Sequence, residues 1–417
     1  MSKNNTDLKI IGSAEIQTVI AKKLSPYLKG KNRSLIIIPD ATRTLPLHVL
    51  FPIINQIAFQ NMCHVDYLIA LGTHPPLADH EIEILVGKEN YKNAEIKYGT
   101  KIFNHDWKNS GQLSCIGIIS REEVSEITGG ILDISIPISI NKLVQAYDQL
   151  IVCGPVFPHE VAGFSGGEKY FFPGIAGEEI IHITHWLGAL TTSMDTIGNR
   201  NTLVRKILRR ASCFIQQPII NMAFCLKEED VYGIFIGEME DTWTKATKLS
   251  AKLNITYVPQ LFESVVSIPS NKYNELWTAA KAMYKLEPVV ADGGKLIIYA
   301  PHLHTISVTH EKHIRRIGYH VKDYFIHQWE QYKDFPWAVL AHSTHLKGKG
   351  RYRAGIEKPR INVILATGIP ENICQEINLD YMHPNSINLS DWENSGNKLV
   401  VYNAGENLYR YIEDKIN

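Results

Sequence analysis

Short runs of aliphatic and β-branched residues alternate with amphipathic stretches along the first half of the chain. The runs at 34–40, 64–74 and 149–156 are almost continuously apolar, as are strands that are buried on both faces of a parallel sheet. The stretches at 45–61 and 202–214 carry the apolar spacing of helices. This strand–helix order predicts an α/β fold with a largely parallel sheet.

The same pattern returns in the second half. Residues 274–290 predict a helix, residues 291–301 a turn that leads into a buried strand, and residues 361–368 and 397–405 two further strands. The histidine-rich stretch 300–350 is read as loops over a cleft.

The length of the chain, 417 residues, is about two to three times that of a usual domain. We therefore expect two α/β domains, 1–257 and 258–417, with largely parallel sheets and an active-site cleft between them.

Composition limits the partners of the chain. Lysine plus arginine and aspartate plus glutamate both number 43, so no basic excess favours nucleic acid or an anionic membrane. The six cysteines are scattered without a CxxC pair, which argues against a disulfide framework or a thiolate zinc site. The amino terminus is polar, and the longest apolar runs are too short to span a bilayer. We expect a cytoplasmic protein that binds a small molecule, without nucleic-acid or membrane partners.

Ionisable residues follow each of the first three predicted strands. Asp40 and Arg43 come after the first, His74 after the second, and His159 and Lys169 after the third. Ligands of open α/β sheets bind at the carboxyl ends of strands. These residue types suit acid–base chemistry on an anion, although an Asp40–Arg43 ion pair in a turn and a structural His74 are the plainer alternatives.

The third strand leads into a glycine-rich segment with a lysine near its centre. Gly166 and Gly167 permit close approach of the backbone to a ligand, but the order of residues does not satisfy a P-loop. Lys169 follows Glu168, so a surface ion pair is the plainer alternative. His185 comes sixteen residues after Lys169 and offers an imidazole for a metal, without a HExxH motif.

Together these motifs resemble the nickel-dependent lactate racemase family, whose members racemise or epimerise 2-hydroxy acids. They stand in order along the chain: PDATR (39–43), GTHPP (72–76), PHEVAGFSGGEKYFFPG (158–174), THW (184–186) and LWTAAKAM (276–283). The resemblance covers essentially the whole chain, and the GGEK segment with its flanking histidines is its most specific part.

The resemblance implies a nickel-pincer nucleotide, a pyridinium mononucleotide whose thioamide and thiocarboxylate arms hold nickel. Lys169 would carry this cofactor covalently, with Gly166 and Gly167 beside it. His185 would be the nickel ligand and Trp337 would line the cofactor. The enzymes that build the cofactor would then be partners of the chain.

The resemblance also implies a mechanism. Transient hydride transfer from C2 of the substrate to the cofactor gives a 2-keto acid, and hydride return to the other face inverts the centre. His74 and His159 would be the acid–base pair. Arg43 and Lys281 would hold the carboxylate, and Asp40 would lie close to the substrate.

Two departures from the family pattern affect the substrate. Trp277 and Thr278 stand where the family has a Tyr-Gln pair, and the segment 301–313 lacks the usual glycine-rich continuation. Both positions would line the pocket around the substrate side chain. His302, His304 and Thr278 add polar groups, so we expect an acid longer than lactate, such as an aldonate.

Two other classes of function stay open. A non-catalytic binder of a nucleotide-like cofactor or a sugar acid would keep the cleft, but it would have no need to retain the four residues Lys169, His185, His74 and His159, and all four are present. A nicotinamide-dependent dehydrogenase is disfavoured because no GxGxxG motif opens a first βαβ unit.

Overall fold

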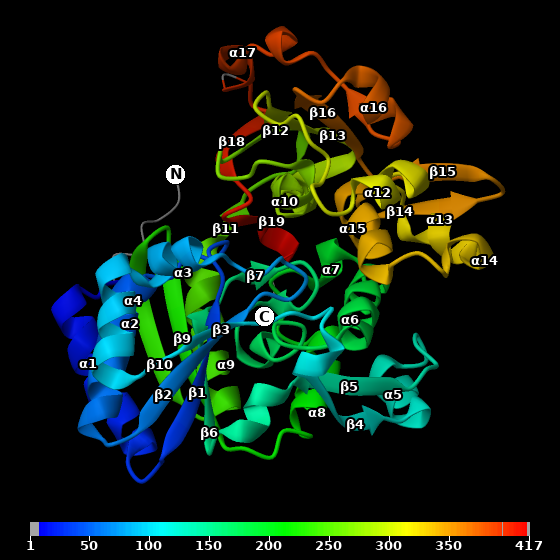
Figure 1. Cartoon of the computed structure of the whole chain (residues 1–417). Helices are drawn as coiled ribbons and strands as arrows, with labels where there is room; N and C mark the ends of the chain where they lie inside the picture. Colours follow the sequence, from blue (N-terminus) through cyan, green and yellow to red (C-terminus); the bar gives the residue numbers. More distant parts are fainter. Residues whose placement is uncertain (1–7, 394, 415–417) are drawn as a thin grey trace. The chain divides into compact units, whose positions relative to one another are not determined.

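The computed structural model describes residues 8–393 and 395–414, so most of the polar amino terminus lies outside the described residues. The chain divides into two compact units, and each is assembled from three stretches of sequence (Figure 1). The first unit contains Met1–Phe157, Ser165–Ile181 and Lys206–Leu253, and the second contains Pro158–Phe164, His182–Arg205 and Asn254–Asn417. The domain bounds 1–257 and 258–417 stay a prediction.

The first unit is built on a six-stranded sheet of order β10-β9-β6-β1-β2-β3. All neighbouring strands are parallel except β10 and β9, which are antiparallel. The strands are β1 (Arg33–Pro39), β2 (His64–Ala70), β3 (Ile102–Asn104), β6 (Gln149–Pro155), β9 (Ile219–Lys227) and β10 (Asp230–Gly237). The three strands predicted from the first half are thus β1, β2 and β6.

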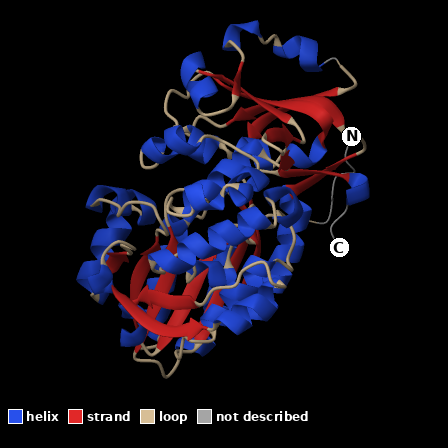
Figure 2. Cartoon of the chain, turned by 90° about the vertical axis from the view of Figure 1, so that its right-hand side faces the viewer, coloured by secondary structure: helices blue, strands red, loops and turns tan. Residues whose placement is uncertain are grey.

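Helices cover the faces of this sheet because its central strands are apolar throughout. Helices α1 (Ser13–Leu28) and α2 (Leu47–Gln60) pack their apolar sides on one face and form the core with β1 and β2. Helix α9 (Met239–Asn254) lies against β9, where the Cys225 thiol donates to the Ala246 carbonyl at 3.2 Å. Figure 2 shows helices, in blue, packed around strands, in red.

The first unit also carries smaller elements, and two helices run from one unit into the other. The smaller elements are α3 (Asp79–Val86), α4 (Lys88–Tyr98), β4 (Leu113–Ile119), α5 (Arg121–Thr128), β5 (Ile136–Asn141) and η3 (Gly167–Tyr170). Helix α6 (Glu178–Leu190) begins in the first unit and ends in the second, and α8 (Leu203–Ser212) does the reverse.

The second unit has a five-stranded, wholly parallel sheet of order β17-β16-β13-β12-β18. Its strands are β12 (Phe262–Pro269), β13 (Val290–Ala300), β16 (Asn362–Thr367), β17 (Asp380–Tyr381) and β18 (Lys398–Ala404). Three two-stranded pairs join it: β7 (Pro158–His159) with β8 (Gly163–Phe164), β11 (Ile255–Val258) with β19 (Leu408–Tyr411), and β14 (Gly350–Arg353) with β15 (Ile356–Pro359). The predicted α/β fold with largely parallel sheets is therefore confirmed.

Short helices fill the rest of the second unit, including the stretch 300–350 that the sequence analysis reads as loops. They are α7 (Ser193–Thr196), α10 (Leu276–Ala279), α11 (Lys281–Tyr284), α12 (Glu311–Ile317), α13 (Lys322–His327), α14 (Trp329–Tyr332), α15 (Trp337–Lys347), α16 (Glu371–Glu376) and α17 (Leu389–Glu393). In the part of the chain that the structure describes, no helix is long and apolar enough to cross a membrane.

Two predicted elements differ from the structure. The helix expected at 274–290 is divided into α10, α11 and a 3-10 turn, and Pro288, which has no N–H, lies in that turn after α11 has ended. The turn expected before β13 is instead part of the strand. The pairing of β12 with β13 shifts register there, and Gly293, at φ +76°, lies in the resulting bulge.

Candidate active site

Two of the predicted site motifs meet at the carboxyl edge of the six-stranded sheet. Strands β1, β2 and β6 are parallel neighbours, so the residues that follow them emerge at the same edge. Asp40 directly follows β1, and the loop after β2 leads to His74. The amide of Gly72 in this loop donates to the carbonyl of Gly174 at 2.9 Å, which joins the GTH loop to the segment that follows Lys169.

Asp40 holds the imidazole of His74. The distance from His74 Nδ1 to Asp40 Oδ2 is 2.5 Å, and the Thr42 hydroxyl donates to Asp40 Oδ1 at 2.6 Å. Burial of Asp40 raises the pKa of its carboxyl, but the hydrogen bond and charge of His74, with smaller effects of Thr42 and Arg43, outweigh burial and hold that pKa below its usual value. The carboxylate is therefore ionised and can only accept a hydrogen bond, so Nδ1 of His74 is the donor and Nε2 is the second ring nitrogen.

Arg43 contributes charge at the same edge rather than a direct bond to the Asp40 carboxylate. Its positive charge lowers the pKa of Asp40 and also that of Tyr170, whose pKa burial nevertheless holds well above the usual value. Tyr170 directly follows Lys169 and covers Gly154 in β6, where an added Cβ would lie 1.7 Å from the tyrosine oxygen. A glycine in a buried strand is the sequence signal for such a close approach, and the sequence analysis missed it.

The loop that carries Lys169 is fixed at its start by Ser165. The Ser165 hydroxyl donates to the Pro155 carbonyl at 3.1 Å, and the Ser165 amide donates to the Phe157 carbonyl at 2.8 Å. The indole N–H of Trp243 on α9 donates to the Ser165 carbonyl at 3.0 Å. Lys169 itself is half-buried on η3. The lysine therefore extends from a backbone with little freedom to move.

The two glycines before Lys169 are required by close packing. Gly166 and Gly167 have φ values of +76° and +61°. An added Cβ would lie 2.6 Å from Val156 Cγ2 at Gly166 and 2.9 Å from Trp243 Cδ1 at Gly167. Protein atoms thus occupy the space beside both glycines, and their contact with a cofactor stays a prediction.

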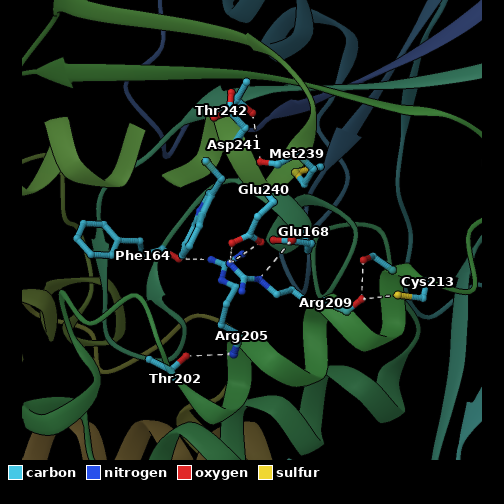
Figure 3. A network of polar contacts seen from close by, with 12 residues as sticks. Phe164, Glu168, Thr202, Arg205, Arg209, Cys213, Met239, Glu240, Asp241 and Thr242 are labelled. Atoms are coloured by element: carbon cyan, nitrogen blue, oxygen red, sulfur yellow. Dashed lines mark hydrogen bonds and ion pairs between the residues drawn. The ribbon is translucent and has the colours of Figure 1, made fainter. Parts of the chain in front are cut away.

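Glu168 is buried and belongs to a polar network with α8 and α9 (Figure 3). Its Oε1 lies 3.8 Å from Nε of Arg209, whose Nη2 donates to Glu240 at 2.7 Å. The Arg209 guanidinium also lies 5.4 Å from the ring centroid of Trp243. Glu168 is only 4% exposed, so it is no surface partner for Lys169. The sequence analysis missed both Arg209 and Trp243.

Gly167→Ala tests this packing. We expect a loss of about 1–3 kcal/mol in the free energy of unfolding, because the added methyl meets Trp243 and a positive φ disfavours alanine. Urea unfolding measures the change. Gly12→Ala is the matched control, since no atom lies within 4 Å of its added Cβ and its φ is −72°. Equal stability of the two variants would contradict a packing role for Gly167.

A buried histidine outside the family motifs supports the turn after Lys169. His105 Nε2 donates to the Ala176 carbonyl at 3.0 Å, and the Asn141 amide lies 3.2 Å from His105 Nδ1. Burial lowers the pKa of His105 to about 4, so the ring is neutral at physiological pH. His105 thereby connects β5 and the loop after β3 to residues 173–177.

In the second unit, His159 lies on β7 and is 6% exposed. Its Nδ1 accepts the backbone N–H of Val161 at 3.1 Å, and Oε2 of Glu160 is 3.4 Å from the same nitrogen. The pairing of β7 with β8 sets His159 opposite Gly163.

His185 lies half-buried on α6, beside a row of three tryptophans. The ring of Trp186 stacks on Trp329 at 5.5 Å, and Trp329 meets Trp337 edge-on at 5.4 Å. The row connects α6 with α14 and α15. Trp337, the predicted cofactor residue, is thus linked through Trp329 to Trp186, which follows His185 in the sequence.

Trp277 is held between two imidazoles. Its indole stacks on His342 at 3.7 Å with an interplanar angle of 8°, and its ring centroid lies 4.4 Å from that of His310. The His342 ring also donates Nε2–H to the Trp277 carbonyl at 3.0 Å. The Thr278 hydroxyl donates to the carbonyl of Glu275 at 3.1 Å.

Lys281 comes one helical turn after Trp277, and its Nζ lies 5.1 Å from the ring centroid of Tyr273. Two histidines are expected from the sequence to add polar groups that would suit a longer acid. Both donate hydrogen bonds to backbone carbonyls instead. His302 donates to the carbonyl of Tyr273 at 3.1 Å, and His304 donates to that of Gly368 at 3.2 Å.

Residues 1–198 match the family model described as the lactate racemase N-terminal domain. The chain is similar to the lactate racemase family. It is 26% identical to a lactate racemase of Thermoanaerobacterium thermosaccharolyticum over 304 residues, and 25% identical to one of Lactiplantibacillus plantarum over 285 residues. These matches cover 71% and 67% of this chain but just under two thirds of each racemase, 66% and 62%.

Two solved structures share this fold over nearly the whole chain. A Thermotoga maritima crystal structure has a TM-score of 0.86 at 31% identity, over 96% of this chain and 99% of that one. The lactate racemase apoprotein of T. thermosaccharolyticum has a TM-score of 0.75 at 19% identity, over 98% of this chain and 97% of that one.

The family motifs are divided between the two units. The first unit holds Asp40, Arg43, His74, Gly166, Gly167 and Lys169, and the second holds His159, His185, Trp277, Thr278, Lys281 and Trp337. The structure brings Asp40, Arg43 and His74 together with the Lys169 loop at one sheet edge. The catalytic roles of all twelve residues stay predictions.

Proposed function

We propose that this chain is a racemase or epimerase that inverts C2 of a 2-hydroxy acid. The observation that carries this proposal is the contact of His74 Nδ1 with the buried, ionised carboxylate of Asp40, at the sheet edge that also holds the Lys169 loop. Two relatives named lactate racemase support it. Because the matches cover less than two thirds of those relatives, the activity and the substrate are proposed rather than transferred.

The cofactor that the family implies is a nickel-pincer nucleotide, and the residues of this chain fit it. Among residues 8–393 and 395–414, no group of three or more His, Cys, Asp or Glu side chains could hold a metal ion. A nickel site here therefore needs donors that the cofactor brings, and one imidazole beside sulfur donors suits nickel. His185 would supply that imidazole, Lys169 would carry the cofactor, and Trp337 would line it. When bound, the cofactor supplies a hydride acceptor for C2.

The chain itself would bind the substrate and move its hydroxyl proton. His74 would accept that proton at Nε2, and His159 would serve the enantiomer whose hydroxyl lies on the other side. Arg43 and Lys281 would hold the carboxylate, so that only the keto carbon changes the face it presents. Asp40, whose carboxylate bonds to His74 and Thr42, would act by orienting His74.

We further propose a substrate longer than lactate, such as an aldonate. This proposal is supported by Trp277 and Thr278, which stand at the position where the family has the residues that line the substrate side chain. His310, whose ring lies against Trp277, is the histidine nearest this pair on the segment 301–313. His302 and His304 are engaged by backbone carbonyls and add little to this proposal.

The double variant Trp277→Tyr, Thr278→Gln tests the substrate wall. We expect the ratio of kcat/KM for lactate to kcat/KM for an aldonate to rise by about 10-fold or more, because the family pair narrows the pocket for smaller acids. Racemisation of both acids by the loaded enzyme measures the ratio. Thr278→Ser, which keeps the hydroxyl bond to Glu275, is the control. An unchanged ratio in the double variant would contradict the proposal that Trp277 and Thr278 line the substrate pocket.

The proposed activity is tested by co-expression with the enzymes that build the cofactor. A panel of single-enantiomer 2-hydroxy acids is incubated with the loaded protein, and chiral chromatography follows inversion at C2. Inversion of at least one acid is the expected result. A loaded protein that binds a sugar acid but inverts no member of the panel would support the non-catalytic binder instead.

A further inference from the structure

The two candidate acid–base histidines have different partners at the same ring atom. In the first unit, His74 Nδ1 faces Asp40 Oδ2 at 2.5 Å. An ionised carboxylate can only accept, so Nδ1 of His74 carries a proton. In the second unit, Nδ1 of His159 faces the backbone N–H of Val161 at 3.1 Å. An amide N–H can only donate, so Nδ1 of His159 carries a lone pair.

We propose that the two histidines rest in opposite tautomers. The neutral ring of His74 has its proton on Nδ1 and a lone pair on Nε2, whereas the neutral ring of His159 has its proton on Nε2. His74 is thus ready to accept a substrate proton, and His159 is ready to donate a hydrogen bond. The tautomers follow from contacts within each unit, and their catalytic meaning rests on the proposed function.

Glu160 is the group that converts His159 into an acceptor. Its Oε2 lies 3.4 Å from His159 Nδ1, beyond the roughly 2.7–3.2 Å of an N–H···O bond. For Nε2 to accept a substrate proton, the ring proton has to move from Nε2 to Nδ1, with no net change in charge. A proton on Nδ1 meets the Val161 N–H unfavourably and needs the Glu160 carboxylate. Glu160 is therefore a positioning residue for His159, as Asp40 is for His74.

Nitrogen-15 NMR of the cofactor-free protein, labelled in histidine, tests the tautomers directly. The shifts of the two ring nitrogens distinguish protonated from unprotonated positions, and the alkaline end of a pH series gives the neutral rings. His74→Gln and His159→Gln assign the two signals. The chain supplies internal references: His304 donates through Nδ1 to the Gly368 carbonyl at 3.2 Å, and His105 donates through Nε2 to Ala176.

We expect His74 to resemble His304 and His159 to resemble His105. The same tautomer in both histidines would overturn the proposal. Asp40→Asn adds a discriminating case, since its amide can donate to Nδ1, and we expect part of the His74 population to move its proton to Nε2. If the tautomer of His74 is the same in Asp40→Asn as in the wild type, Asp40 does not determine that tautomer.

Kinetics of the loaded enzyme test Glu160 separately. We expect Glu160→Gln to lower kcat about 10-fold or more with KM within about twofold, and Glu160→Asp to restore most of kcat. Because the equilibrium constant belongs to the two enantiomers, kcat/KM has to fall equally in both directions. Unchanged kcat in Glu160→Gln would overturn the role of Glu160. Failure of wild type to invert any acid would refute the proposed function and leave the NMR result to decide the tautomers.

Discussion

Lys169→Ala is expected to abolish racemisation, with a loss of more than about 10³-fold in kcat/KM, because the variant has no amine to carry the cofactor. The fold is expected to persist, since Trp243 and Ser165 fix this loop through the backbone. Intact-mass spectrometry after co-expression with the cofactor-building enzymes measures the adduct, and chiral chromatography measures the activity.

Lys206→Ala is the matched control, because Lys206 is exposed on α8 in the same unit. The control variant is expected to keep both the mass addition and the activity. A mass addition that survives in Lys169→Ala would place the cofactor on another residue. Loss of activity without loss of the adduct would give Lys169 a different role.

Three histidines with lowered pKa values are expected to make the protein acid-sensitive. Burial lowers the pKa of His105 to about 4, of His342 to about 3 and of His345 to about 4. In the unfolded chain these groups titrate near pH 6.5, so the unfolded state binds more protons than the native state below that pH. Their contribution to stability is complete above about pH 6.5 and is lost as the pH falls toward 4.

The expected slope is large, since three protons are taken up on unfolding, each worth about 1.4 kcal/mol per pH unit. Urea unfolding between about pH 8 and pH 4 measures it. His345→Leu is expected to remove about one proton from the slope without loss of stability at pH 8, because neither ring nitrogen of His345 has a hydrogen-bond partner. His48→Gln, at an exposed position, is expected to leave the slope unchanged. If His345→Leu has the same pH dependence of stability as the wild type, the ring of His345 is not held neutral in the native state.

The sheet and the places of its polar residues are readable from the sequence because they are local. A buried parallel strand is a short apolar run, and the residue after it lies at the carboxyl edge whatever the rest of the chain does. The runs at 34–40 and 64–74 therefore predicted β1 and β2, together with the exit positions of Asp40 and His74. The contact between these two side chains cannot be read from the local sequence, because their loops meet only when β1 and β2 pair in the sheet.

The supports of the Lys169 loop could not be predicted for the same reason. Trp243 bonds to Ser165 across 78 residues of sequence, and Arg209 reaches Glu168 from another helix. Nothing near Glu168 distinguishes a buried carboxylate from a surface one. His105 gives as little local signal, since a histidine next to an aspartate is equally common in an exposed loop.

The interleaving of the two units has a consequence for synthesis on the ribosome. Strands β7 and β8 and residues 182–205 emerge before the first unit is complete, yet the rest of their own unit begins only at Asn254. Two segments of the second unit are therefore released before the sheet of that unit can form. A nascent chain synthesised as far as Leu253 thus contains all strands of the first sheet and two segments whose own unit is incomplete. We expect a chaperone to bind the nascent chain most readily at this stage.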